Sequence, residues 1–110
     1  PIEALLHNQL KPLGIVKNLH PTPAVAGLPR TTASQLIQTT ESFDRGLYAS
    51  PIGWVDTNGN SEFIVGIRSA LIDNRRARLF AGAGIVSQSD PQRELAEIKL
   101  KLQALLGILM

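Results

Sequence analysis

The chain has 110 residues, of which 44% are apolar and 18% are charged, and its formal net charge at neutral pH is +2. This composition fits a single globular unit rather than a disordered chain, and the small charge does not favour nucleic-acid binding. The absence of cysteine excludes disulfides, a thiolate metal site and a cysteine nucleophile.

No apolar run approaches the ~20 residues that a membrane-spanning helix needs, and the first residues show no signal-peptide pattern. We therefore expect a cytoplasmic protein with no membrane partner. The first residue is Pro1 rather than Met, which suggests a processed or truncated chain.

The first part of the chain should hold two helices separated by an irregular segment. Residues 1–18 are expected to be mostly helical, with an interruption at Pro12. Apolar residues recur there at helical spacing, at Ile2, Leu5, Leu6 and Leu10. Residues 19–29 contain several prolines and a glycine, which exclude a regular helix and a central strand. A second helix should begin near Thr32, in a capping-box sequence, and end at Gly46.

The middle of the chain, residues 47–86, should form an antiparallel β-meander of three strands. A short strand is expected over 52–55, followed by a hairpin turn whose Asn-Gly pair suits positive φ angles. Residues 62–72 alternate between two faces, which predicts one continuous strand. A third strand is expected over 77–86 and ends in a glycine-bearing segment.

A last helix should begin at Asp90, which suits the N-cap position and is followed by Pro91 at the first helical position. It should run to about Gly107. One apolar stripe follows it, formed by Leu95, Ile98, Leu102, Leu105, Leu106 and Leu109. The expected fold class is therefore α+β, with an antiparallel β-meander flanked by helices.

The last helix also carries the strongest candidate for chemistry. Glu94, Glu97 and Lys101 fall on one side of it, along the border of the apolar stripe. Two carboxylates one turn apart suit a hard cation such as Mg²⁺, and the lysine suits an anionic group. The alternative is an ordinary surface pair between Glu97 and Lys101, stabilising the helix by a few tenths of a kcal/mol.

Three further candidates remain open on the residues alone. Arg68 lies between small neighbours in an apolar strand, so it either offers a bidentate fork to a carboxylate or faces solvent. The amides of Gly82 and Gly84 suit an oxyanion, or they mark a bulge or strand end. His20 lies in a rigid proline frame, although a lone histidine is usually structural or solvated.

An ordered set of segments runs along the chain and is specific when taken together. They are Leu19-His20-Pro21-Thr22-Pro23-Ala24-Val25, Phe43-Asp44-Arg45-Gly46-Leu47-Tyr48-Ala49, Ile52-Gly53-Trp54, Ile67-Arg68, Phe80-Ala81-Gly82-Ala83-Gly84-Ile85-Val86, Ser89-Asp90-Pro91 and Glu94-x-x-Glu97-x-x-x-Lys101. This set resembles the C-terminal part of the chorismate-utilising enzymes over essentially the whole chain. The first segment resembles isochorismate synthases, and the Thr-Gly-Ala-Pro-Lys type of segment of anthranilate synthases is absent.

The resemblance implies a Mg²⁺-dependent conversion of chorismate to isochorismate, in which water attacks C2 of the ring and the C4 hydroxyl leaves. It implies that Glu97 binds Mg²⁺ directly and that Glu94 reaches it through water. Arg68 and Lys101 would bind the substrate carboxylates, with Gly82 beside them. The residues implied to line the substrate pocket are Ala24, Val25, Tyr48, Ile67 and Phe80, with His20 close by in a less defined role.

The resemblance also implies that part of the enzyme lies elsewhere. The family's general base, a lysine, and its general acid, a glutamate, lie upstream of the matched region, so no catalytic residue is expected here apart from a possible role for His20. Residues 1–110 would be the C-terminal part of a chorismate-binding domain with two α+β halves. The expected partners are chorismate and the missing N-terminal portion. The alternatives are a segment of a salicylate- or anthranilate-type enzyme and a non-catalytic fragment with half a chorismate site.

Overall fold

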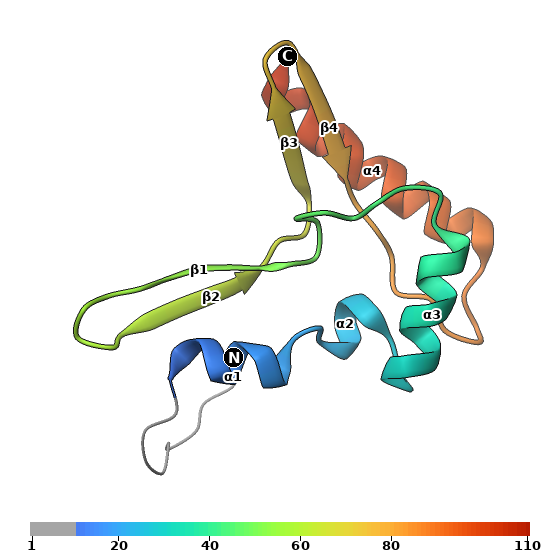
Figure 1. Ribbon diagram of the computed structural model, residues 1–110. Helices are drawn as coiled ribbons and strands as arrows, with labels where there is room; N and C mark the ends of the chain where they lie inside the picture. The colour runs from blue at the N-terminus through green and yellow to red at the C-terminus, as the bar shows by residue number, and fades with distance from the viewer. Residues whose placement is uncertain (1–10) are drawn as a thin grey trace.

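The computed structural model describes residues 11–110 and has the α+β organisation expected from the sequence (Figure 1). The expected helix over 1–18 is described only from residue 11 onward, so its apolar positions Ile2 to Leu10 lie outside the described residues. The elements are α1 (Pro12–Leu19), α2 (Pro23–Ala26), α3 (Arg30–Thr40), β1 (Pro51–Val55), β2 (Ser61–Val65), β3 (Ser69–Asp73), β4 (Arg76–Phe80) and α4 (Pro91–Leu109).

Two of the prolines expected to prevent helix instead begin one. Pro12 is the first residue of α1, and Pro23 is the first residue of the four-residue helix α2. Proline is tolerated at this position because its missing N–H would have no partner in the helix and its fixed φ is already helical. The prediction that 19–29 contains no helix was therefore wrong for residues 23–26.

Helix α3 differs from its prediction at both ends. It begins at Arg30 rather than near Thr32, and no side chain caps its N-terminus, so the predicted capping box does not form. It ends at Thr40, well before Gly46. The segment from Glu41 to Ser50 instead winds back toward α2 through a turn in which Ala49 has a φ of 63°.

The strands form two separate hairpins rather than one three-stranded meander. β1 pairs with β2 and β3 pairs with β4, both antiparallel, in two two-stranded sheets. The continuous strand predicted over 62–72 was wrong, because the chain breaks between Val65 and Ser69. The last strand ends at Phe80 rather than at Val86. In Figure 1 the two hairpins diverge from this break, and only β3–β4 runs beside α4.

Two residues at the break explain why the strand cannot continue. Gly66 is buried against the turn after α3, where its N–H donates to the Ser50 carbonyl at 2.9 Å and its carbonyl accepts from the Ala49 N–H at 2.8 Å. Arg68 has a φ of +47°, in the left-handed region that a strand does not use. The alternating pattern of residue types is the same on both sides of the break, so it carried no sign of this turn.

Helix α4 begins as the sequence predicted. The Asp90 carboxylate accepts a hydrogen bond from the Arg93 N–H at 2.9 Å, and Pro91 is the first helical residue. The helix continues to Leu109, two residues past the predicted end. No helix within residues 11–110 combines the length and the apolar content that crossing a membrane requires.

The described residues enclose almost no core. Only two of their apolar residues are buried, Ala26 and Ala49, and both are small. No residue of the long helix α4 is buried, and large apolar side chains such as Ile64 and Ile72 on the hairpins are more than 60% exposed. Exposed apolar surface of this extent is typical of a face that packs against another layer.

We therefore expect the isolated 110-residue chain to self-associate and to bind the dye ANS, because it leaves its apolar faces in water. Size-exclusion chromatography with light scattering and a thermal melt followed by circular dichroism would test this. A monodisperse monomer with a sharp, cooperative melt and no ANS fluorescence would contradict the expectation.

Candidate functional site

Lys101 is the centre of the first group of candidate residues. Its ammonium donates a hydrogen bond to the Gly82 carbonyl at 2.9 Å and forms an ion pair with Glu97, one helical turn earlier on α4. The Lys101 side chain is 20% exposed, whereas that of Glu97 is 54% exposed. The predicted pair is thus not confined to the helix surface, because Lys101 also links α4 to the glycine-bearing segment after β4.

The charge on Glu97 is stabilised by its neighbours. The pKa of its carboxyl lies below the usual value, chiefly because the Lys101 ammonium hydrogen-bonds to the carboxylate and attracts it electrostatically. The guanidinium of Arg68 adds a smaller effect in the same direction. The fold therefore brings Arg68, Glu97, Lys101 and Gly82 to one region, although they come from the break between the hairpins, from α4 and from the end of β4.

The acidic residues of α4 fit one part of a magnesium site. Glu94 is half-buried one turn before Glu97 on the same helix, and carboxylate oxygens are the ligands that Mg²⁺ prefers. Within residues 11–110 no group of three or more acidic, histidine or cysteine side chains is placed to hold a metal ion. These two glutamates would thus be partial ligands, completed by groups from outside the described chain and by water.

An aromatic stack joins the end of β4 to the turn after α3. The Tyr48 and Phe80 rings are nearly parallel, with centroids 5.3 Å apart, and Phe43 lies against Phe80 at 6.0 Å. A Cβ atom on Gly82 would lie 2.6 Å from the Tyr48 hydroxyl. Because such a contact would force the ring to move, glycine at this position keeps the stack beside the Gly82 carbonyl that Lys101 uses.

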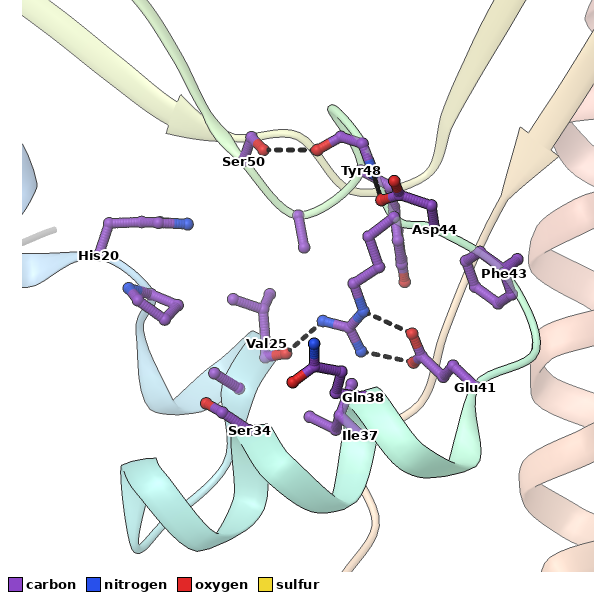
Figure 2. A pocket seen from close by; sticks show the side chains of 15 residues that line it. His20, Val25, Ser34, Ile37, Gln38, Glu41, Phe43, Asp44, Tyr48 and Ser50 are labelled. Atoms are coloured by element: carbon purple, nitrogen blue, oxygen red, sulfur yellow. Dashed lines mark hydrogen bonds and ion pairs between the residues drawn. The ribbon is translucent and has the colours of Figure 1, made fainter.

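A cavity of about 580 Å³ lies between α2, α3 and the turn that follows α3 (Figure 2). Three of the predicted site residues line it, namely His20, Val25 and Tyr48. Figure 2 shows His20 across the opening from Ser34 and Gln38 of α3. The His20 carbonyl accepts a hydrogen bond from the Arg30 guanidinium, which fixes the end of α1 against the start of α3.

Arg45 lines this cavity, and no role was predicted for it from the sequence. Its guanidinium donates to both carboxylate oxygens of Glu41, at 2.7 and 2.6 Å, and to the Val25 carbonyl at 2.8 Å. The hydrogen bond to Glu41 is the main cause that raises the pKa of Arg45. Glu41 and Arg45 are four residues apart, the spacing of an ion pair on a helix. They lie beyond the end of α3, so this spacing alone did not predict that they pair.

The remaining predicted residues lie apart from this cavity. Arg68, Phe80, Gly82 and Lys101 form a second group, and none of them lines the cavity. Phe80 stacks on Tyr48, Lys101 hydrogen-bonds to Gly82, and Arg68 lies near enough to Glu97 to lower its pKa. Three other predicted residues do not line the cavity either. Ala24 is exposed on α2, Ile67 is 51% exposed at the break between the hairpins, and Glu94 lies on α4. The structure therefore divides the predicted residues into two groups that meet at Tyr48.

Both the sequence and the fold match known proteins. Residues 1–110 match the family described as chorismate binding enzyme, and the chain belongs to that family.

Several relatives have narrower descriptions. The chain is 48% identical over 96% of its length to a salicylate biosynthesis isochorismate synthase of Pseudomonas aeruginosa, of which it covers 22%. It is 44% identical over 99% of its length to the isochorismate synthase MenF of Bacillus subtilis, of which it covers 23%. A crystal structure from Bacillus anthracis, assigned as a 2,3-dihydroxybenzoate-specific isochorismate synthase, matches with a TM-score of 0.86 and 45% identity over 90% of this chain and 26% of that one.

The chain spans less than a third of the length of each of these relatives.

The lowered pKa of Glu97 leads to a prediction about pH. A depressed carboxyl pKa means that the ion pair with Lys101 stabilises the fold above the usual pKa of glutamate, and that this contribution is lost as the pH falls through the lowered value. Replacing Lys101 with Met should raise the Glu97 pKa toward its ordinary value. A carboxyl ¹³C titration, with the resonance assigned by Glu97→Gln, would measure it. An unchanged pKa in Lys101→Met would contradict the assignment.

Proposed function

We propose that this chain forms the C-terminal part of a Mg²⁺-dependent isochorismate synthase that converts chorismate to isochorismate. The observation that carries the proposal is the position of Lys101, which is held between the Glu97 carboxylate and the Gly82 carbonyl, with Arg68 near enough to influence Glu97. The high identity to isochorismate synthases of several bacteria over nearly the whole chain supports the same activity.

In this proposal the two cationic side chains bind the substrate's carboxylates. Chorismate is a dianion, and the guanidinium of Arg68 offers the planar fork that a carboxylate accepts. The Lys101 ammonium is already ordered by Gly82 and Glu97, so it loses little freedom when it binds an anion. Tyr48 and Phe80 supply an apolar wall for the ring, together with Ile67, Ala24 and Val25.

Glu97 would hold Mg²⁺ directly, and Glu94 would hold its water ligands. The ion would neutralise carboxylate charge and fix the orientation of the substrate. Glu97 suits the direct role because its side chain is the more exposed member of the pair with Lys101, so one of its oxygens remains accessible. Its lowered pKa keeps it in the anionic form that binds metal.

The proton transfers would be performed by residues outside this chain. Addition of water at C2 needs a general base, and departure of the C4 hydroxyl needs a general acid. The resemblance implies that these groups, a lysine and a glutamate, would lie in the upstream part of the enzyme. This chain would therefore bind and orient chorismate, with His20 at the edge of the site, while the N-terminal portion completes the reaction.

This division of labour gives a test of the proposed function. The parent enzyme should convert chorismate to isochorismate with Mg²⁺, whereas the isolated 110-residue chain should not, because each general acid or base group typically contributes about 10²- to 10⁴-fold. Chromatography of the products would measure both. A parent enzyme without isochorismate synthase activity would refute the proposal. Turnover by the isolated chain that disappears in Glu97→Ala would refute the division of roles.

The metal assignment leads to a separate prediction in the parent enzyme. Glu97→Gln should weaken Mg²⁺ binding more than Glu94→Gln, because a direct ligand is lost rather than a bond to a bound water. Glu97→Asp should also weaken it through its shorter reach. Lys101→Ala should weaken chorismate binding while the metal still binds. Isothermal titration of Mg²⁺ with and without chorismate would measure these effects. Normal Mg²⁺ binding by Glu97→Gln, together with loss of binding in Lys101→Ala, would contradict the roles.

A further inference from the structure

We propose that Arg45 is a positioning residue that holds α2, and with it Val25, at a fixed place opposite Tyr48. This inference rests on the proposed function, because it concerns the wall of the site that receives the substrate. It adds a residue that neither the sequence pattern nor the family resemblance assigned to that site.

The hydrogen bonds of Arg45 use the two sides of its guanidinium for different partners. Nε and Nη2 bind the two carboxylate oxygens of Glu41, and Nη1 binds the Val25 carbonyl. All three donor–acceptor distances fall between 2.6 and 2.8 Å. Such a set needs a planar group with donors in fixed directions. A lysine ammonium keeps the charge and cannot reproduce this geometry.

Helix α2 needs such an external contact. It has only four residues, and helices this short are not stable on their own. The last carbonyl groups of a helix find no N–H donors farther along it, and the Val25 carbonyl accepts its hydrogen bond from Arg45 instead. If this hydrogen bond is lost, packing against α3 is the main contact that still holds α2.

The same guanidinium also contacts the opposite wall. Its central carbon lies 5.6 Å from the centroid of the Tyr48 ring, within cation–π range. Tyr48 in turn stacks on Phe80. One side chain therefore connects α2 to the aromatic stack at the end of β4. The side chains of Arg45 and Glu41 are 28% and 27% exposed, so solvent only partly screens the pair.

The test compares Arg45→Lys with Arg93→Lys in the parent enzyme. The Arg93 guanidinium is a matched control, because its residue is exposed on α4 and its backbone N–H alone takes part in the helix cap. Arg45→Lys should raise the KM for chorismate about tenfold or more, as expected for lost hydrogen bonds to a charged group. Its kcat should change by less than about twofold, because binding rather than chemistry is affected.

Hydrogen exchange provides a readout that does not require turnover. The amides of residues 25–27, which donate the backbone hydrogen bonds of α2, should exchange faster in Arg45→Lys than in the unaltered parent, while the amides of α4 remain protected. If the parent does not convert chorismate, the proposed function fails, and this measurement still decides whether Arg45 holds α2. Unchanged exchange over residues 25–27 would overturn the inference.

The partner residue distinguishes positioning from a general loss of folded protein. Glu41→Gln keeps the shape of the side chain and leaves the bond from Arg45 to Val25 possible, so it should raise KM in the same direction by a smaller factor. The double variant should raise KM by less than the product of the single effects, because both act through one network. A fall in kcat with unchanged KM in both single variants, or strictly multiplicative effects, would overturn the inference.

Discussion

The stack of Tyr48 on Phe80 is the contact on which the two groups of candidate residues depend. Tyr48 comes from the turn after α3 and Phe80 from the last position of β4, so the stack joins segments that share no hydrogen-bonded sheet. It places the Gly82 carbonyl next to α4, where Lys101 reaches it. The Tyr48 ring of the stack also lies within cation–π range of Arg45. Loss of the stack would separate the group around Lys101 from the cavity beside α2.

Polar contacts do much of the work of holding these residues in place, because the described residues enclose so little apolar core. Lys101 links α4 to the segment after β4, and Arg45 links α2 to the turn after α3. Each cation satisfies a backbone carbonyl and also pairs with a glutamate four residues away in sequence. Ion pairs that are only partly buried stabilise a fold modestly. Their main effect here is to fix the direction of the Lys101 and Arg45 side chains.

The sequence predicted some elements and not others for identifiable reasons. Helix α4 was predictable because Asp90 and Pro91 mark its start and a long apolar stripe follows. The hairpin of β1 and β2 was predictable from its Asn-Gly turn. The break after β2 was not, because it depends on Gly66 packing against a distant turn and on a left-handed Arg68. Alternation in residue type continues across such a turn and does not reveal it.

The candidate site also has features that the sequence predicted and features that it did not. The pairing of Glu97 with Lys101 follows from helical spacing and was predicted, whereas the reach of Lys101 to Gly82 depends on how the chain returns after β4. Arg45 was missed because its partners are Glu41, beyond the end of a helix, and the backbone of Val25. Every residue has a backbone carbonyl, so the sequence does not show which one accepts a hydrogen bond. The assigned roles in substrate and metal binding remain predictions.

The separation of the strands into two hairpins has a consequence for variation among related chains. Because β1 and β2 pair only with each other, the turn from Asp56 to Asn60 can lengthen or shorten without altering the register of β3 and β4. Exposed hairpin tips of this kind accept insertions readily. The distal end of the first hairpin is therefore a place where a new epitope, tag or reporter can be introduced while β3, β4 and α4 keep their positions.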